Sequence, residues 1–398
     1  MNILDQIKEE LPWLGNNEIY DLTRGKPSPN QLLLSQKLIE SISQPFEMDG
    51  VDLRNYGTPE GIKSARNLGS TILDTDEDKT LALDNSSLTL MHQILACSYF
   101  LGFSSSKLTP ESKFICLVPG YDRHFKLLEN FGIEMISVPF LENGPDIEKI
   151  KEFIAKDNSI HGIVCVPRHS NPTGHTFTDE QVDQIFKAVQ PNKENFMIIW
   201  DNAYACHDLK ETIKQSSASS IASSNGVEDN LFILGSTSKI TLAGAGISFI
   251  STAAENLDQF ISYRNSLTPA PNKMNQGLHA KIFSQVSIID HMTELKKLIL
   301  PKFELVESYL LNLKKMNLCE FTSPTGGYFF SFESANNNAE EIINACGEVG
   351  LKLLPVGSCF PYLKDPNNSN IRIAPTFPNI EDLEKCMEIF SKVVIRLN

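Results

Sequence analysis

A lysine surrounded by small residues could carry the chemistry of this chain. Lys239 lies in the segment GSTSKITLAGAG, directly after a short apolar run. An ammonium group is rarely buried without a partner, and burial lowers the pKa of a lysine amine. The uncharged amine is a nucleophile that can form a Schiff base with a carbonyl group. A solvated lysine in a surface loop would have the same local sequence, so Ser-x-Ser-Lys alone leaves both interpretations open.

An aspartate and a tyrosine follow a second apolar run, in the segment Asp201-Asn202-Ala203-Tyr204. A carboxylate buried at the end of a strand must be paired. A protonated pyridine nitrogen, as in pyridoxal phosphate, would be such a partner, because the carboxylate keeps the ring charged and able to take up the electrons of a carbanion. Tyr204 could then donate to the phenolic oxygen of the same ring. The alternative is that Asp201 only caps the next turn.

A tight-turn sequence, Asn171-Pro172-Thr173-Gly174, follows a third apolar run. Alone it would be structural, although its asparagine could also reach the phenolic oxygen. The order of the three motifs is more informative than any one of them. Asn-Pro-Thr-Gly, Asp-x-x-Tyr and Ser-x-Ser-Lys, each after a run of apolar residues, would rarely occur together by chance.

Five short apolar runs predict the strands that position these motifs. The runs are FICLV (114–118), IVCV (163–166), FMIIW (196–200), LFILG (231–235) and ISFIS (247–251). Continuous apolar runs of this length are typical of strands buried on both faces, as in parallel sheets. A helix is predicted over 178–190, where Thr178 and Gln181 form a capping box. We therefore expect an α/β sheet with helices on its faces.

The polar motifs stand at the carboxyl ends of the predicted strands, where parallel sheets bind their ligands. The side chains expected to converge at this edge are those of Tyr121, Asn171, Asp201, Tyr204 and Lys239.

The pattern changes after residue 290. Helices are predicted over 291–316, 338–350 and 379–397, and short strands over 328–332 and 371–374. This alternation is typical of an α+β unit, which we expect to pack with N-terminal residues. The predicted division is a large domain at 51–290 and a small domain built from 1–50 and 291–398. The serine-rich stretch 216–224 is expected to be a surface loop.

Composition excludes several classes of protein. The chain has 398 residues and a net charge of −14, from 35 basic and 49 acidic side chains, which disfavours nucleic acid as a partner. No apolar run approaches the length of about 18 residues that a membrane-spanning helix needs, and the N-terminus lacks the features of a signal peptide. Eight scattered cysteines without a CxxC pair indicate free thiols in a reducing cytoplasm. The eight histidines show no metal-ligand spacing, and there is no P-loop or G-x-S-x-G elbow.

Taken together, the motifs resemble those of the pyridoxal-phosphate-dependent aminotransferases of fold type I, class I/II. Within that family they are similar to those of the bacterial aspartate aminotransferases of type Ic. The segments that carry the likeness are DLTRGKPSP (21–29), NYGTPEGIKSAR (55–66), GYDRHF (120–125), HSNPTG (169–174), DNAYACHDL (201–209), GSTSKITLAGAG (235–246) and IRIAPTFP (371–378). The resemblance implies a large domain with a mostly parallel seven-stranded sheet flanked by helices, and a small α+β domain.

The resemblance also implies roles for residues around the cofactor. Lys239 would hold pyridoxal 5'-phosphate as a Schiff base and then carry the proton between Cα of the substrate and C4′ of the cofactor. Asp201 would pair with the pyridine nitrogen, and Asn171 and Tyr204 would bind the phenolic oxygen. Tyr121 would stack on the ring.

By the same resemblance, the cofactor phosphate would lie at a helix N-terminus formed by Asn85, Ser86 and Ser87, with Ser236 as a further ligand. Tyr56 would reach the phosphate of the neighbouring subunit, which implies a homodimer with shared sites.

One position departs from the family pattern. Most relatives have a phosphate-binding arginine eight residues after the lysine, and this chain has Ile247 there. We expect Ser238, Thr241, a backbone N–H group or a distant basic side chain to replace that arginine.

Arg372 corresponds to the arginine that binds the substrate α-carboxylate in the family, since a guanidinium can bind a carboxylate through two hydrogen bonds. The backbone N–H group of Gly25 would meet the same carboxylate. A second substrate carboxylate would need another cation. The candidates are Arg24, Lys26, Arg123, Arg168 and Lys273, of which Arg24 and Arg123 are preferred because they lie in matched motifs.

The predicted activity is transamination between aspartate and 2-oxoglutarate, which gives oxaloacetate and glutamate by a ping-pong mechanism. Small amino acids and 2-oxo acids would be the partners, in the cytoplasm. An aminotransferase for another amino acid, a lyase or a decarboxylase is the alternative, because one fold supports many reactions. A transcription regulator with an aminotransferase-like domain is not expected, because the matched motifs begin at residue 21 and leave no room for a DNA-binding domain ahead of them.

Overall fold

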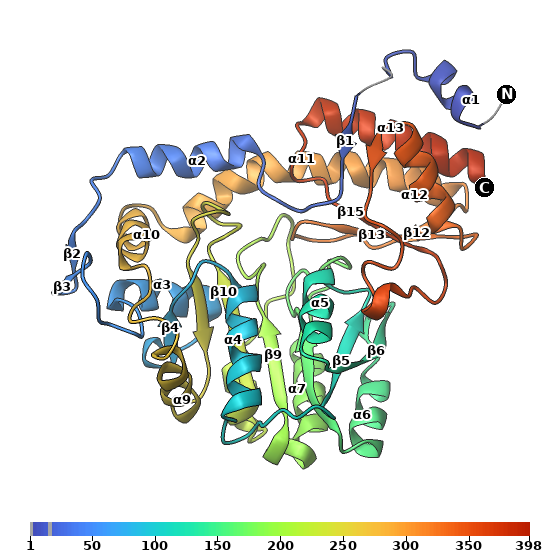
Figure 1. Ribbon diagram of the computed structural model, residues 1–398. Helices are drawn as coiled ribbons and strands as arrows, with labels where there is room; N and C mark the ends of the chain where they lie inside the picture. The colour runs from blue at the N-terminus through green and yellow to red at the C-terminus, as the bar shows by residue number, and fades with distance from the viewer. Residues whose placement is uncertain (1–2, 15–17) are drawn as a thin grey trace.

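The larger part of the molecule is built around an eight-stranded sheet (Figure 1). The computed structural model describes residues 3–14 and 18–398. The strand order is β4 (Thr80–Ala82), β11 (Ser248–Ser251), β10 (Leu231–Ser236), β9 (Met197–Asp201), β8 (Ile160–Cys165), β5 (Lys113–Val118), β6 (Glu134–Leu141) and β7 (Gly144–Pro145). The strands from β10 to β6 are parallel, whereas β11 is antiparallel to both of its neighbours and β7 is antiparallel to β6.

The five strands predicted from apolar runs are all present, with ends shifted by a few residues. The sheet has one strand more than the seven that the resemblance implies. The chain turns back after β6, and the two residues of β7 pair with its end. Gly144 makes this turn possible, because its φ of 131° lies in a region that other residues avoid.

Alternate residues of the central strands belong to two separate cores. In β9, Ile198 and Trp200 pack in one core, and Met197 and Ile199 pack in the other. Both faces of the sheet are therefore buried, as continuous apolar runs predict. One face is covered by α3 (Lys63–Leu73), α6 (Ile147–Lys156), α7 (Asp179–Val189) and α8 (Ala218–Ser224), and the other by α4 (Ser87–Phe100), α5 (Asp122–Asn130) and α9 (Ala254–Arg264).

Two local predictions can be compared with these helices. Helix α7 begins at the capping box of Thr178 and Gln181, as predicted. The serine-rich stretch 216–224 was expected to be a loop, and that expectation is wrong because the stretch contains α8. Ala222 of α8 is fully buried in the core, and this tertiary contact outweighs the weak helix propensity of the serines around it.

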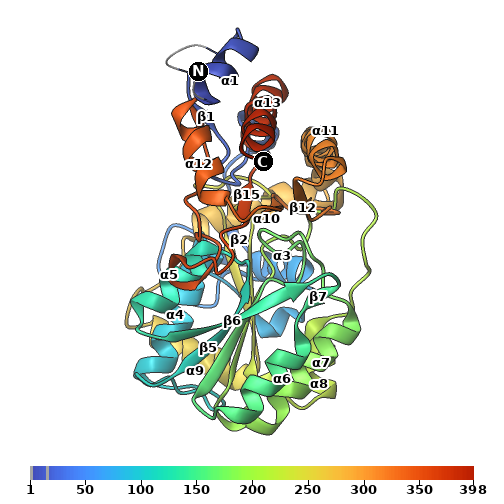
Figure 2. The same ribbon diagram turned by 90° about the vertical axis from the view of Figure 1, so that its right-hand side faces the viewer.

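A second part of the molecule lies beyond the carboxyl ends of the parallel strands, and both chain ends lie in it (Figures 1 and 2). It contains α11 (Ile288–Lys315), α12 (Ala339–Glu348), α13 (Ile380–Leu397) and an antiparallel sheet of β12 (Cys319–Phe321), β13 (Phe330–Ser334) and β15 (Asn370–Ile373). The helices and strands predicted in this region are present, with ends shifted by a few residues. Together with the large sheet they confirm the predicted fold class.

N-terminal residues complete this second part. Helix α1 (Ile3–Glu10) packs against α13, and β1 (Tyr20–Asp21) pairs with β14 (Leu351–Lys352) as a parallel ladder. Ile7, Leu11, Tyr20 and Leu22 belong to the same core as residues of α11, α12 and α13. The predicted domain boundaries, after residues 50 and 290, stay predictions.

The remaining elements are α2 (Pro29–Glu40), the hairpin of β2 (Glu47–Met48) and β3 (Val51–Asp52), α10 (Lys273–Gln285), and 3₁₀ turns at Glu77–Lys79, Gln190–Asn195, Glu228–Asn230 and Pro361–Leu363. Among the described residues, no helix is both long enough and apolar enough to cross a membrane. The eight cysteines are free thiols, and seven of them are buried.

Candidate active site

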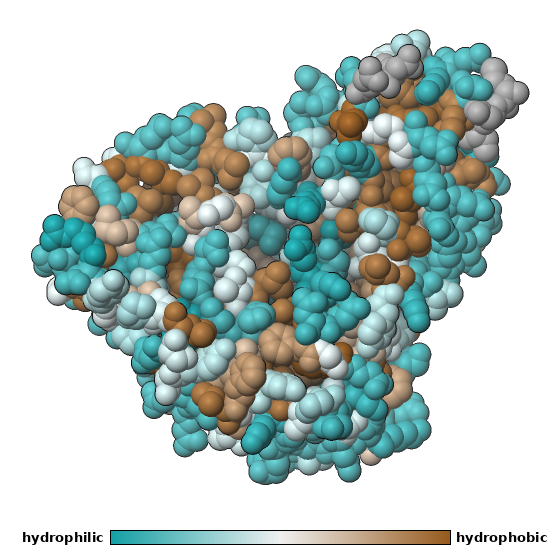
Figure 3. Space-filling view, viewed as in Figure 1, coloured by the Kyte–Doolittle hydropathy of each residue, from teal (hydrophilic) through white to brown (hydrophobic). Residues whose placement is uncertain are grey.

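A cavity of about 170 Å³ lies at the carboxyl ends of the parallel strands. Its lining comes from the segments that follow β5, β8, β9 and β10 and from the start of α4: Ser86, Ser87, Leu88, Tyr121, Val166, Asn171, Asp201, Ala203, Tyr204, Ser236, Ser238 and Lys239. The structure thus brings together all five side chains expected to converge there, and adds four serines to them. Figure 3 shows that one face of the molecule is hollowed near its centre, between the two parts.

Lys239 follows β10, and its side chain lines the cavity. Its Nζ lies 4.9 Å from the centroid of the Tyr204 ring. Burial lowers the pKa of Lys239; the carboxylate of Asp201 opposes the shift, and the charge on Arg372 adds to it. An amine in these surroundings gives up its proton more readily than a solvated one, as a nucleophile or a base requires.

The main-chain carbonyl of Lys239 is held by two side chains. The hydroxyl of Tyr328 and Nε2 of His207 each donate to it across 3.3 Å. The amide of Gln31, in the first turn of α2, donates in turn to the hydroxyl of Tyr328 at 3.0 Å. Burial lowers the pKa of His207 to about 3, so its ring is neutral and carries its proton on Nε2. The backbone of the lysine is therefore tied to the N-terminal segment.

Asp201 ends β9 and is 3% exposed. Nε2 of His124, on α5, donates to its Oδ2 at 2.9 Å. Its Oδ1 has no hydrogen-bond partner among the described residues. An unpaired buried carboxylate oxygen costs free energy, so this atom marks a place for a ligand group that donates a proton or carries positive charge.

Two tyrosines and an asparagine provide further polar groups. Burial raises the pKa of Tyr204 well above its ordinary value, and burial raises the pKa of Tyr121 to about 12. Both phenols are therefore protonated at neutral pH and can donate hydrogen bonds. Asn171 is buried, and its Oδ1 accepts a hydrogen bond from Arg372 at 3.3 Å.

The start of α4 has the features of an anion-binding site. The helix begins at Ser87, and the side chain of Ser86 caps it by accepting from a backbone N–H group of the first turn at 3.3 Å. The other N–H groups of a first turn and the helix dipole attract anions. The hydroxyls of Ser236 and Ser238 line the same cavity, whereas Asn85 does not line it and instead accepts from the Ser238 hydroxyl through its carbonyl, at 2.9 Å.

Ile247 stands where most relatives have the phosphate-binding arginine. It is 1% exposed and packs in a core, and its N–H group donates to the hydroxyl of Thr237 at 2.9 Å. Among the suggested replacements, Ser238 lines the cavity, whereas Thr241 does not line it and its hydroxyl is bonded to His279 at 2.8 Å. The donors that line the cavity at this end are therefore hydroxyl and N–H groups.

Arg372 lies on β15, and its side chain is 4% exposed. One terminal nitrogen donates to Oδ1 of Asp122 at 3.1 Å, and the other donates to the carbonyl of Thr23 at 3.0 Å. The central carbon of the guanidinium lies 4.6 Å from the centroid of the Phe329 ring. A Cβ atom on Gly25 would come within 2.3 Å of that ring, so only a glycine lets the N-terminal segment approach so closely.

Arg372 does not line the cavity, and neither do the basic residues suggested for a second carboxylate. Arg24 and Arg123 are exposed. The amine of Lys26 lies 3.7 Å from the centroid of a phenylalanine ring, and the amine of Lys273 donates to the carbonyl of Tyr56 at 3.0 Å. Tyr56 is itself 77% exposed and does not line the cavity of its own chain.

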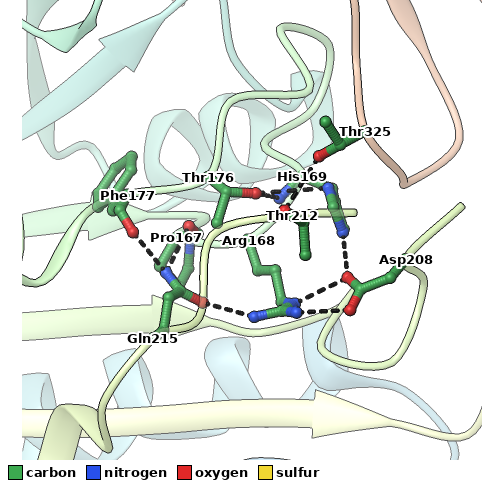
Figure 4. Close-up of polar contacts among 9 residues, drawn as sticks. All are labelled: Pro167, Arg168, His169, Thr176, Phe177, Asp208, Thr212, Gln215 and Thr325. Atoms are coloured by element: carbon green, nitrogen blue, oxygen red, sulfur yellow. Dashed lines mark hydrogen bonds and ion pairs between the residues drawn. The ribbon is translucent and has the colours of Figure 1, made fainter. Parts of the chain in front are cut away.

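Arg168, the remaining basic candidate, is engaged in a polar cluster (Figure 4). It donates to both oxygens of Asp208, at 3.1 and 2.7 Å, and Nε2 of His169 donates to Oδ1 of Asp208 at 2.7 Å. Burial alone would raise the pKa of Asp208, but the hydrogen bonds from His169 and Arg168 outweigh burial and lower the pKa. The cluster joins the loop that carries Asn171 to the loop that carries Tyr204.

Four residues near this site are missing from the site predicted from the sequence. His124 had a detectable signal, because it lies three residues after Tyr121 in GYDRHF and therefore on the same side of α5. Asp122 lies in the same segment, but nothing in the sequence indicates a role for it. Tyr328 and Phe329 had no signal at all, because only the folded chain brings the residues before β13 next to Lys239 and Arg372.

The chain is similar to known proteins over most of its length. The family described as aspartate amino-transferase matches residues 15–397. An aspartate aminotransferase of Corynebacterium glutamicum is 38% identical over 378 residues, which are 92% of this chain and 87% of that protein. A crystal structure of an aspartate transaminase from the same species has a TM-score of 0.91 at 36% identity, over 98% of this chain and 94% of that one. An α-aminoadipate aminotransferase of Thermus thermophilus, solved with N-(5'-phosphopyridoxyl)-L-leucine, shares the fold with a TM-score of 0.77 at 16% identity, over 100% of this chain and 95% of that one.

Proposed function

The chain belongs to the aspartate amino-transferase family, and from this premise we propose that it transfers the amino group of aspartate to 2-oxoglutarate, forming oxaloacetate and glutamate. The observation that carries the proposal is that one cavity is lined by both Lys239 and Asp201, and that Oδ1 of Asp201 has no partner among the described residues. Amino-group transfer needs these two groups: an amine that moves a proton, and a carboxylate that keeps an electron-accepting ring charged.

The residues around the cavity fit the ring of pyridoxal 5'-phosphate. Oδ1 of Asp201 is an unpaired buried acceptor suited to a protonated pyridine nitrogen. Tyr204 and Asn171 would hold the phenolic oxygen, and Tyr121 would stack on the ring. When bound, this cofactor supplies a carbonyl that condenses with an amine and a ring that takes up the electron pair of a carbanion.

The serines of the cavity fit the phosphate group of that cofactor. Ser86 and Ser87 lie at the start of α4. Ser236 is the last residue of β10, and Ser238 lies in the segment after it. Together with the N–H groups of the first helical turn they would form a set of neutral donors around a dianion. These donors would bind the phosphate in place of the arginine that most relatives have at the position of Ile247.

The chain's own groups would then guide the substrate. Arg372 would bind the α-carboxylate and orient Cα toward Lys239, with Phe329 packed against the guanidinium. Nζ of Lys239 would take the proton from Cα of the substrate and deliver it to the cofactor. The lowered pKa of Lys239 favours the uncharged amine that takes up this proton. The same groups acting in reverse on the 2-oxo acid would complete a ping-pong cycle.

A second candidate is a different amino donor, and one observation favours testing it. Lys239 is the only basic residue among the described residues that line the cavity. Aspartate has a distal carboxylate that needs a cation. We propose that Arg24 or Arg123 provides it, because the first adjoins Gly25 and the second adjoins Asp122. If neither does, an amino acid with one carboxylate, or lyase chemistry on the same cofactor, becomes the better assignment.

We also propose that the enzyme works in the cytoplasm as a homodimer with shared sites. Tyr56 is exposed in the single chain, and its backbone is fixed by Lys273. Both properties suit a side chain that reaches the phosphate of a neighbouring subunit. The free thiols of all eight cysteines suit a reducing compartment.

The decisive experiment is the visible spectrum of the purified protein, with and without borohydride, for the wild type and Lys239→Ala. We expect the wild type to absorb in the visible region and borohydride to fix the cofactor covalently to Lys239, as peptide mass spectrometry would detect. Lys239→Ala should lose the covalent product. A wild-type protein that binds no cofactor, or a variant with the same product, would contradict the proposal.

A scan of amino donors with 2-oxoglutarate as acceptor then separates the substrates. Glutamate formation from aspartate, with much weaker formation from monocarboxylic donors, is the expected result. Equal or greater turnover of a monocarboxylic donor would reject aspartate as the substrate and leave the cofactor assignment intact.

A further inference from the structure

The substrate-binding guanidinium already has an anionic partner within its own chain. Asp122 is the first residue of α5, and its Oδ1 lies 3.1 Å from a terminal nitrogen of Arg372. The start of a helix stabilises a carboxylate, so this partner is held in place by α5. The side chain of Arg372 is 4% exposed and that of Asp122 is 28% exposed, so the arginine is buried and the aspartate remains accessible from solvent.

The hydrogen-bond donors of Arg372 are largely occupied. One terminal nitrogen serves both Asp122 and Asn171, and the other serves the carbonyl of Thr23. Nε has no partner among the described residues. A carboxylate that binds through two parallel hydrogen bonds needs two adjacent donors. At the edge formed by the two terminal nitrogens of Arg372, one of the two already donates to Asp122.

Asp122 differs from the other two partners of Arg372 because it is charged. Asn171 and Thr23 contribute neutral oxygens, which an incoming anion can share without repulsion. A second carboxylate beside Asp122 would meet a like charge across a few ångströms in a poorly hydrated site, where such repulsion is strong. Binding of the substrate carboxylate at this edge therefore requires the Asp122 carboxylate to move away.

We propose that Asp122 competes with the substrate carboxylate for Arg372. While no substrate is bound, it neutralises a buried guanidinium that would otherwise be costly to keep in the fold. When a carboxylate substrate arrives, Asp122 is displaced toward solvent, and the cost of that displacement weakens the binding of every carboxylate at this position. The proposal rests on the proposed function, which assigns the substrate α-carboxylate to Arg372.

Asp122→Asn tests the proposal, because the amide keeps the size and an acceptor oxygen while the charge is lost. The probe is succinate, a dicarboxylate that has no amino or oxo group and cannot react. We expect calorimetric titration of the holoenzyme to give a Kd for succinate about five- to tenfold lower in the variant than in the wild type. The KM values for aspartate and 2-oxoglutarate should fall together, with kcat changed less.

Two controls separate competition from other effects. Glu129→Gln removes one charge from the same helix, where Glu129 pairs with Lys126 at 2.8 Å and does not touch Arg372, and it should leave the Kd for succinate unchanged. Asp122→Ser, which also suits the start of a helix, should tighten succinate binding like Asp122→Asn. An unchanged or higher Kd in both Asp122 variants, with thermal midpoints close to the wild type, would overturn the proposal.

Arg372→Lys distinguishes this failure from failure of the proposed function. Weaker succinate binding in Arg372→Lys, together with tighter binding in Asp122→Asn, supports both proposals. Weaker binding in Arg372→Lys without any effect of Asp122→Asn overturns only the role of Asp122. Succinate binding that is unaffected by Arg372→Lys would remove the substrate carboxylate from Arg372, and both proposals would fall.

Discussion

At the scale of single residues, Asp201 and Arg372 each have a buried polar atom that lacks a partner within the described chain, and of these two residues only Asp201 lines the cavity. Oδ1 of Asp201 is an unpaired acceptor, and Nε of Arg372 is an unpaired donor. Buried polar groups are nearly always hydrogen-bonded, so each atom indicates the character of its missing ligand. Asp201 suits a cationic donor such as a protonated ring nitrogen, and Arg372 suits an anion such as a carboxylate.

Tyr204→Phe tests one of these residues by removing a single hydroxyl. The raised pKa of Tyr204 means that the variant loses a hydrogen-bond donor and not a charge. We expect kcat with aspartate to fall by about a hundredfold, at the lower end of the range seen when one positioned donor is removed. Tyr309→Phe, on α11, is the matched control and should keep full activity. Unchanged kcat in Tyr204→Phe would mean that the hydroxyl takes no part in the reaction.

At the scale of elements, three segments that carry site residues are fastened to one another. The cluster around Asp208 joins the segment after β8 to the segment after β9 (Figure 4). The segment before β13 is attached to the same place, because backbone N–H groups of Leu209 and Lys210 both donate to the carbonyl of Thr325 at 2.9 Å. Asn171, Tyr204 and Phe329 are thus positioned by one network that bridges both parts of the molecule.

Asp208→Asn should weaken this network in a pH-dependent way. The pKa of Asp208 is lowered in the folded protein, so its ionised form stabilises the fold. That contribution is complete above the unfolded-state pKa of about 3.9 and is lost as the pH falls through the lower folded-state pKa. We expect the variant to unfold about 2–4 °C below the wild type at pH 7 and the gap to close below about pH 4.

Calorimetric melting curves across this pH range would measure the effect of Asp208→Asn. Asp76→Asn, which removes an exposed carboxylate 3.5 Å from Lys79, is the control and should change the midpoint little at any pH. A deficit in Asp208→Asn that stays the same from about pH 4 down to a pH below the folded-state pKa of Asp208 would mean that packing, and not the charge of Asp208, stabilises the network.

At the scale of the whole molecule, shared sites predict that two defective subunits can complement each other. Tyr56→Ala and Lys239→Ala would each damage every site of a homodimer. A mixed dimer would contain one site with both residues intact, so random mixing on co-expression should restore about a quarter of the wild-type activity. Co-expression of Asp201→Ala with Lys239→Ala should restore none, because both residues belong to one subunit's site. No recovery in the first pair would contradict the shared site.

The strands and the convergence of the cavity residues could be predicted from the sequence because both depend on local patterns. Strands buried on both faces read as unbroken apolar runs, and parallel strands must end at one edge of the sheet. The environment of Arg372 could not be predicted, because Thr23, Asp122 and Phe329 come from three distant segments that only the fold brings together. The cation for a distal carboxylate stays unassigned for a related reason, since Arg24 and Arg123 are exposed in the single chain.

The pairing of β1 with β14 has a consequence for how the chain is made. Tyr20 pairs with Leu351, so one strand leaves the ribosome long before its partner exists. Synthesis at about 5–20 residues per second leaves the first strand alone for roughly 15–65 seconds. Until β14 and α13 are made, Ile7, Leu11 and Leu22 lack the residues of those two elements that complete their core, whereas every strand of the large sheet is made before β14. A nascent chain of this protein therefore carries an apolar N-terminal segment that a ribosome-bound chaperone can hold until α13 is synthesised.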